Sequence, residues 1–194
     1  MANKFSAYLY QITNVKTVIL FLLLFFITIG VIFPLISNML GLPEDLESAD
    51  TAFNYNVDEL YEIIETYDPP ARKASAVFHF SADLIFPIVY LFSFGTLISF
   101  TLSQGLPKST WLQRANLTPL FLFVFDLLEN TGLAILFTRY PTKLLGLARV
   151  TSFISVIKWC LSGLSVILVL VGLLGMLLNI FKPIHPKDQT DNQS

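Results

Sequence analysis

Four long apolar blocks divide this chain of 194 residues and constrain its fold more than any other feature. The blocks are residues 17–40, 76–102, 117–138 and 147–181. Each is long enough to cross a bilayer as a helix, which takes about 20 residues. A helix also pairs its own backbone polar groups, as hydrocarbon requires. The sequence therefore predicts an all-α protein, a single polytopic membrane domain built as a four-transmembrane-helix bundle.

The composition supports a membrane bundle and excludes several classes of function. Hydrophobic residues make up 54% of the chain and charged residues 13%, about half the charged share of a typical soluble domain. The net charge of −2 comes without a basic stripe, so we expect no nucleic-acid partner. Cys160 is the single cysteine, which excludes an internal disulfide. The sequence carries no phosphate-binding glycine loop, serine-hydrolase elbow or zinc-protease motif.

The segments between the blocks are polar, and the first loop carries most of the acidic charge. Residues 41–75 hold nine acidic and two basic side chains. Within this loop Asn56 and Glu59 form a capping-box pattern, and apolar residues then recur at helical spacing. We predict a short amphipathic helix near Val57–Tyr67 that lies over the bundle, with a solvated acidic loop as the alternative. Short polar segments, residues 1–16 and 182–194, flank the spans.

Besides Arg149 near the entrance of the fourth block, four charged side chains interrupt the second, third and fourth blocks: Asp83, Asp126, Glu129 and Lys158. Counted from the block ends nearest the acidic loop, they lie at depths of roughly 10–18 Å in a core of ~30 Å. Charged residues in hydrocarbon are costly and normally face a protein interior or a wet cavity. We therefore expect one shared site, open or nearly open toward the acidic loop.

The polar residues suggest roles within this site. Acid–base catalysis on a lipid-soluble substrate needs a protonated acid, a charged base and an apolar pocket. The candidates for catalysis are Asp83, Asp126, Glu129 and Lys158. Smaller or neutral polar groups on the same spans are candidates to contact a ligand: His79, Tyr90, Asn130, Ser155 and Ser162. The alternative is structural, with ion pairs that hold the helices in register and serines that bond back to their own helix.

No cofactor is expected from these residues, with a divalent cation as the alternative. Its ligands would be His79, Asp83, Asp126 and Glu129. Oxygen-rich ligation of this kind would favour Mg²⁺ or Mn²⁺ over zinc.

The polar motifs resemble those of a recurrent group of bacterial four-span membrane proteins that has no assigned activity. The resemblance is carried by Asp83-x3-Pro87-x2-Tyr90, Asp126-x2-Glu129-Asn130, the later Lys158, and Arg72 before the second span. It implies the four-span architecture and the site but names no substrate. More distantly, four spans with a long first loop are similar in layout to the EXPERA family of sterol isomerases and lipophilic-cation receptors.

These patterns favour an integral membrane protein that binds or acts on a lipid, an isoprenoid or a lipophilic cation by acid–base chemistry. The alternatives are a structural or assembly subunit with a buried ion-pair network, and a proton- or ion-coupled transport component. The apolar second half of the last block, residues 166–178, disfavours transport because it leaves no polar route. The sequence leaves open whether the chain forms an oligomer.

The distribution of basic residues gives an expected orientation. Lys and Arg divide six against five between the two sides of a four-span topology. With the larger number inside, we expect a protein of the bacterial inner membrane with both termini in the cytoplasm.

Overall fold

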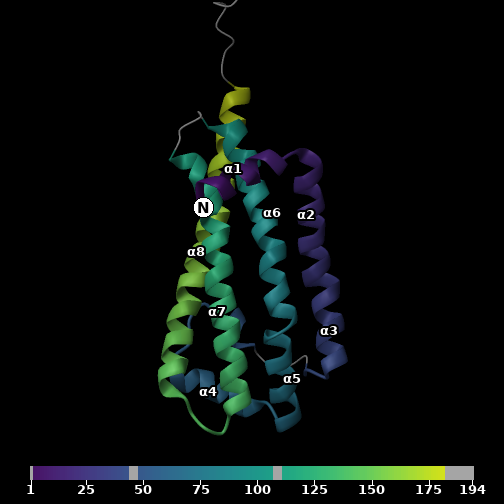
Figure 1. The fold of residues 1–194 in the computed structure, drawn as a ribbon, viewed down its shortest axis with the longest axis vertical. Coiled ribbons are helices and arrows are strands. Elements are labelled where there is room, and N and C mark those ends of the chain that lie inside the picture. The colour runs from purple at the N-terminus through teal and green to yellow at the C-terminus, as the bar shows by residue number, and fades with distance from the viewer. Residues whose placement is uncertain (1, 44–47, 107–110, 182–194) are drawn as a thin grey trace, which may run out of the picture.

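The computed structural model describes residues 2–43, 48–106 and 111–181, and within these ranges the protein is helical with no β-strand. Four helical segments are long and apolar enough to span a membrane: Val15–Leu40, Pro69–Gly105, Leu112–Arg139 and Leu145–Ile180. They run along one another as an elongated bundle (Figure 1). The predicted all-α bundle of four membrane-spanning helices is confirmed.

The first span consists of three consecutive helical pieces, α2 (Val15–Ile27), η1 (Thr28–Ile32) and α3 (Phe33–Leu40). Asn14 begins the span with a capping box, two residues before the predicted start. The widened π-helical turn η1 comes directly before Pro34, which lacks the N–H that a regular α-helix would use there. The proline therefore changes the helix locally without ending the span.

The second span is broken, which the sequence analysis did not predict. It consists of α5 (Pro69–His79) and α6 (Ala82–Gly105), separated by two residues. Asp68 starts α5 early because its side chain accepts a backbone N–H of the first turn and prolines follow it. The prediction of one helix over 76–102 was therefore wrong at its start and in its continuity, and the acidic loop is shorter than expected.

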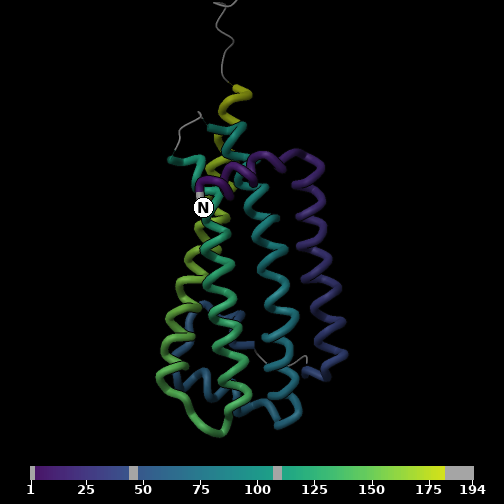
Figure 2. The backbone as a smooth tube through the Cα atoms, viewed as in Figure 1, coloured from purple at the N-terminus to yellow at the C-terminus, as the bar shows by residue number. Residues whose placement is uncertain are grey.

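The third and fourth spans agree with the predicted blocks to within two residues. The short helix η3 (Leu112–Leu117) leads into α7 (Thr118–Arg139), and α8 (Leu145–Ile180) is the longest helix described. Helices α6, α7 and α8 pack against one another, whereas α2 packs mainly on α6 (Figure 2). The polar residues of the last three spans can therefore meet in one interior.

Glycines allow α8 to approach its neighbours closely. A Cβ atom added to Gly105 of α6 would lie 2.1 Å from the backbone oxygen of Gly172. One added to Gly132 of α7 would lie 2.3 Å from Thr151 Oγ1 on α8. One added to Gly175 would lie 2.3 Å from the Gly105 oxygen. Small residues let helix backbones approach in membranes, and Gly172 and Gly175 have this role on α8.

The acidic loop contains the predicted amphipathic helix, α4 (Val57–Thr66). The Asn56 side chain accepts the Glu59 N–H while the Glu59 side chain accepts the Asn56 N–H, so the capping box is confirmed. The fully buried Leu60 belongs to a core cluster with Leu133 of α7. Helix α4 therefore covers one end of the bundle.

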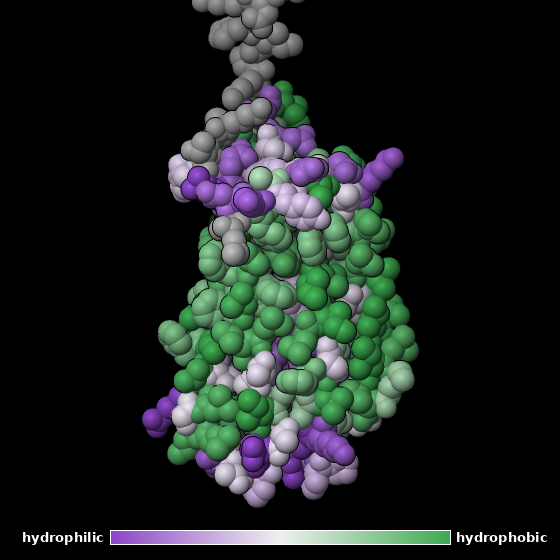
Figure 3. All heavy atoms as spheres, in the orientation of Figure 1, coloured by the Kyte–Doolittle hydropathy of each residue, from purple (hydrophilic) through white to green (hydrophobic). Residues whose placement is uncertain are grey.

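The opposite end carries a helix that the sequence analysis missed, α1 (Ala2–Ile12), which crosses the bundle there (Figure 1). Ser6 Oγ donates to Asn116 Oδ1 at 2.6 Å, and Asn116 Nδ2 donates to Ser99 Oγ at 2.9 Å. Figure 3 shows a wide hydrophobic band between two hydrophilic ends. The predicted polar tail, residues 182–194, lies outside the described residues.

Candidate functional site

Lys158 on α8 is the centre of a buried charged cluster. Its Nζ lies 2.5 Å from Glu129 Oε2 and 3.6 Å from Asp126 Oδ1, both on α7. All three residues are buried, and Glu129 is fully enclosed. Ion pairing offsets the large cost of placing each charge in a low-dielectric interior. The structure thus brings three of the four predicted charged residues into one cluster.

The fourth residue, Asp83, is held beside this cluster through its backbone. Pro87 lacks the N–H that would otherwise bond to the Asp83 carbonyl four residues earlier. Asn130 Nδ2 donates to that carbonyl at 3.0 Å and also lies 3.4 Å from Asp126 Oδ1. The asparagine of α7 therefore replaces the donor that the proline of α6 removes. This pairing gives a physical reason for the D-x3-P and D-x-x-E-N motifs to occur together.

His79 and Asp83 meet across the break between α5 and α6. His79 Nδ1 lies 2.9 Å from Asp83 Oδ2, and both side chains are buried. Asp50 of the first loop joins them, with one possible ligand atom from each of the three residues within 4.8 Å of the others. The expected divalent-cation set included Asp126 and Glu129 instead. The structure separates those two acids from His79 by directing them to the lysine of α8.

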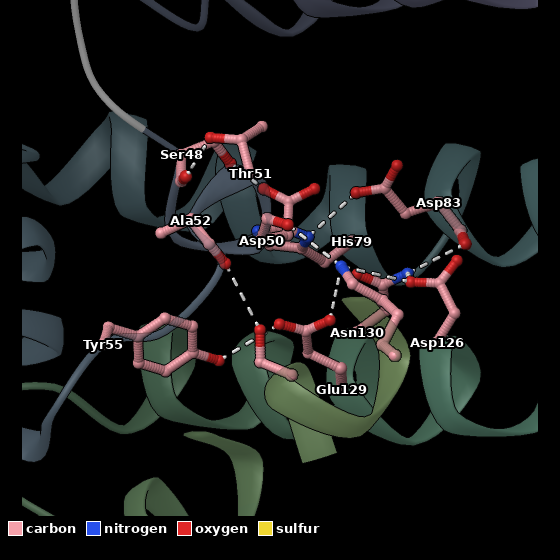
Figure 4. A network of polar contacts seen from close by, with 12 residues as sticks. Ser48, Asp50, Thr51, Ala52, Tyr55, His79, Asp83, Asp126, Glu129 and Asn130 are labelled. Carbon is pink, nitrogen blue, oxygen red and sulfur yellow. Dashed lines mark hydrogen bonds and ion pairs between the residues drawn. The ribbon is translucent and has the colours of Figure 1, made fainter. Parts of the chain in front are cut away.

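The first loop covers this end of the site, which the sequence predicted to be open or nearly open toward the loop. The Asp50 carbonyl accepts a hydrogen bond from Lys158 Nζ at 2.9 Å. The Tyr55 phenol donates to Glu129 Oε1 at 3.2 Å. Figure 4 shows the segment from Ser48 to Tyr55 lying across the charged residues of the bundle. Burial raises the pKa of the Tyr55 phenol, and the nearby Glu129 raises it further.

Sequence reasoning missed Asp50 and Tyr55 as parts of the site. Both lie in a loop without helical periodicity, and Asp50 is one of many acids there. The available signal was the pair of aromatic residues Phe53 and Tyr55 inside an acidic segment. Tyr55 is only 1% exposed, whereas Phe53 is 60% exposed, so Tyr55 is the anchor of the loop.

A cavity of about 380 Å³ adjoins the charged cluster. Its polar wall consists of Asp50, Asp83, Asp126, Asn130 and Lys158. Its aromatic wall draws on α2, α3, α6 and α8 and includes Phe25, Phe33, Phe86, Phe94 and Trp159. The volume is within the range of roughly 300–1,000 Å³ that small-molecule sites occupy. One cavity therefore offers charged and apolar surfaces together.

Two buried polar atoms of the cavity-lining residues have no hydrogen-bond partner in the described part of the chain, Asn130 Oδ1 and Trp159 Nε1. A buried polar atom left unpaired costs about 1–3 kcal/mol. By contrast, Tyr90 Oη on the same wall donates to Asp126 Oδ2 at 2.9 Å. Both atoms are buried within the wall rather than exposed to the cavity.

The predicted site residues divide into two groups by their relation to this cavity. Those that line it are Asp83, Tyr90, Asp126, Asn130, Lys158 and Ser162. Those that do not are His79, Glu129 and Ser155. Ser155 Oγ lies 3.5 Å from the Ala52 carbonyl, so it supports the first loop instead. Glu129 lies behind Lys158 as its ion-pair partner.

The fold and the buried charges define a four-span helical membrane protein with a polar cavity inside its bundle. No model of a known protein family, no curated protein and no solved structure matches the chain. The resemblance to bacterial proteins with the D-x3-P-x2-Y and D-x-x-E-N motifs stays a prediction. The function must therefore be argued from the cavity.

Proposed function

We propose that the protein binds an amphipathic small molecule taken from the bilayer, such as a lipid, an isoprenoid or a lipophilic cation. The polar head of this molecule lies against Asp83, Asp126 and Lys158, and its hydrocarbon part lies along the phenylalanines of the opposite wall. The observation that carries the proposal is the cavity itself, which joins an aromatic wall to a charged wall. Its wall carries three carboxyl groups and one ammonium group that can pair with the head group.

Access from the membrane is supported by the way in which the first span packs. Only 6% of its most apolar window is buried inside the protein. Ile29 lines the cavity and is 44% exposed, and its neighbours Ile27 and Val31, which do not line the cavity, are 46% and 50% exposed. The cavity wall on this side is therefore one helix thick and faces lipid. A molecule with an apolar tail enters between spans without crossing water.

The charges of the cavity favour a basic head group. Its lining includes three acids, Asp50, Asp83 and Asp126, against a single lysine, Lys158. That lysine is already paired with Glu129 at 2.5 Å behind the cavity. Aromatic rings also attract cations through their π faces. An amine therefore gains more from this wall than an alcohol does, and a carboxylate is repelled.

The test uses the intrinsic fluorescence of the cavity. The chain has two tryptophans; Trp159 lines the cavity, and Trp111, directly before η3, is 75% exposed. In a Trp111→Phe background reconstituted in phosphatidylcholine nanodiscs, Trp159 emission is titrated at pH 7 with dodecylamine, dodecanol and dodecanoate. These probes share one tail and differ in the head group.

We expect a saturable change in Trp159 emission with dodecylamine, a weaker one with dodecanol and none with dodecanoate. Asp83→Asn removes a charged partner and weakens dodecylamine binding by about tenfold. Glu62→Gln, at an exposed acid of α4 outside the cavity, leaves the titration unchanged. Equal and unsaturable responses to the three probes would show partitioning into lipid and would contradict the proposal.

Acid–base chemistry on the bound molecule is a second candidate function. It is favoured by the position of Asp126, which accepts from Tyr90 at 2.9 Å and faces Lys158 at 3.6 Å on the cavity wall. The Asp126 carboxyl group can exchange a proton with a bound ligand. If it is, an Asp126→Asn variant keeps bound probe but loses turnover of the natural molecule.

The location expected for this function is the bacterial inner membrane, with both termini in the cytoplasm. The even number of spans supports termini on one side, and the small excess of Lys and Arg on that side supports the orientation. Cysteine labelling of an Asn3→Cys variant, compared with a Glu62→Cys variant, tests it in intact cells; both positions are exposed, and both variants carry Cys160→Ser.

A further inference from the structure

A second cavity lies at the outer surface of the bundle, in a groove between α5 and α7. It has a volume of about 680 Å³ and is lined at its rim by Lys73 and Arg139. Below the rim its walls are apolar and include Val77, Phe80 and Ile135, each of which is at least 40% exposed. It shares no lining residue with the cavity beside Lys158.

The two basic residues of this groove lack an acidic partner. No Asp or Glu of the described residues lies within ion-pair distance of Lys73 or Arg139. None of the residues that line the groove is acidic. Two unpaired cations at the rim of an apolar, lipid-facing groove therefore leave a positive site without a counter-charge.

The neighbouring charged residues are already engaged. Arg72 stacks over the Tyr140 ring at 4.6 Å and donates to the carbonyl of Tyr67. Lys143 lies 3.3 Å from Glu65. The Tyr140 phenol and this lysine hold the pKa of Glu65 below its usual value, so this acid of α4 already has partners that do not line the groove. The contrast singles out Lys73 and Arg139.

We propose that this groove binds an anionic phospholipid, with its phosphate between Lys73 and Arg139 and its acyl chains along Val77, Phe80 and Ile135. The dimensions fit this occupant. From Lys73 to Ser81 the groove follows eight residues of α5 and its end, or about 12 Å of depth. That distance runs from the head-group level into the hydrocarbon. Basic pockets between spans bind anionic lipid head groups in this manner.

The test measures lipid adducts by native mass spectrometry on the delipidated full chain. Phosphatidylglycerol and phosphatidylcholine with identical acyl chains are added in separate titrations. We expect phosphatidylglycerol to bind about fivefold more tightly or better, because each basic residue near the surface contributes a factor of about five. Lys73→Gln with Arg139→Gln abolishes this preference. Arg149→Gln, at an exposed residue of α8 outside the groove, keeps it.

Three outcomes would overturn the proposal: equal binding of the two lipids, an unchanged preference in the Lys73→Gln/Arg139→Gln protein, or equally strong adducts with inorganic phosphate alone. The last outcome would assign the site to a free anion. The exchanged variant Lys73→Arg/Arg139→Lys keeps both charges and must keep the preference. It therefore separates loss of the site from loss of the fold. The result is independent of whether the inner cavity binds a molecule.

Discussion

Lys158 contacts two parts of the chain, and its positive charge compensates the negative charge of the buried acids. It contacts Glu129 and Asp126 of α7 through ion pairs and the Asp50 carbonyl through a hydrogen bond. Asn130 has a comparable role for the backbone, because it supplies the donor that Pro87 withholds from the Asp83 carbonyl. The spacing of these polar residues is visible in the sequence, and the structure gives the physical reason for it. The sequence did not show which partner each residue contacts.

Removing the lysine should cost more than removing its partner. Lys158→Met leaves two buried carboxyl groups facing each other, and breaking a buried pair in this way costs about 3–5 kcal/mol of unfolding free energy. Glu129→Gln costs less, because Lys158 keeps its ion pair with Asp126 and can donate a hydrogen bond to the amide oxygen of the new glutamine. Thermal denaturation in detergent measures both, and equal losses would show that the site is solvated rather than buried.

The anchor of the first loop should be sensitive to alkaline pH. Burial raises the pKa of Tyr55, so the unfolded chain loses this proton first and the stabilisation is present below about pH 10 and falls above it. Tyr55→Phe lowers the unfolding free energy by about 1–2 kcal/mol at pH 8 through the lost hydrogen bond to Glu129. Between pH 8 and 11 it then loses less stability than the wild type.

Melting temperatures at the two pH values measure this difference. Tyr8→Phe, at a half-exposed ring of α1, is the matched control and should change neither value. If the melting temperatures of the wild type and of Tyr55→Phe fall by the same amount between pH 8 and 11, the phenol of Tyr55 is not buried as described.

At the scale of helices, the sequence located the spans well and their irregularities poorly. The apolar blocks predicted α7 and α8 to within two residues because hydrophobic length alone defines a span. The break before Ala82 was missed, because no proline or glycine marks it and the polar contact of His79 with Asp83 is formed only in the folded bundle. Helix α1 was missed because its contacts, such as Ser6 with Asn116, join distant parts of the chain.

Close contact between helices should make two glycines of α8 respond in opposite ways. A Cβ added to Gly172 would lie 2.5 Å from Thr101 Oγ1, whereas one added to Gly163 meets nothing within 4 Å. Gly172→Ala should therefore lower stability by about 1–3 kcal/mol through overpacking. Gly163→Ala should be neutral or raise it by up to about 1 kcal/mol through helix propensity. Thermal denaturation of the two variants checks the sign, and the same sign for both would contradict the packing.

At the scale of the whole molecule, three spans form the interior and the first span closes one side of a cavity. The sequence predicted that Asp83, Asp126, Glu129 and Lys158 lie at a common depth, and the structure places them around one region. It did not predict that Glu129 would lie behind Lys158, outside the cavity lining. The sequence predicted a helix of the first loop over the bundle, but not that the segment from Ser48 to Tyr55 lies across the charged residues, because that placement depends on tertiary contacts such as that of Tyr55 with Glu129. The sequence predicts how deep each residue lies along its span, but it does not predict which neighbouring helix the side chain faces.

The central claim is that the inner cavity holds a molecule from the membrane, and occupancy tests it most directly. Ser162 lines the cavity, and Gly163 beside it has open space around its Cβ position. Ser162→Phe therefore fills the cavity, while Gly163→Phe adds the same ring outside it. Native mass spectrometry of protein released from membranes should show a retained small molecule in the wild type and in Gly163→Phe, and its loss in Ser162→Phe. The same adduct in all three proteins, or no adduct in any, would contradict the account.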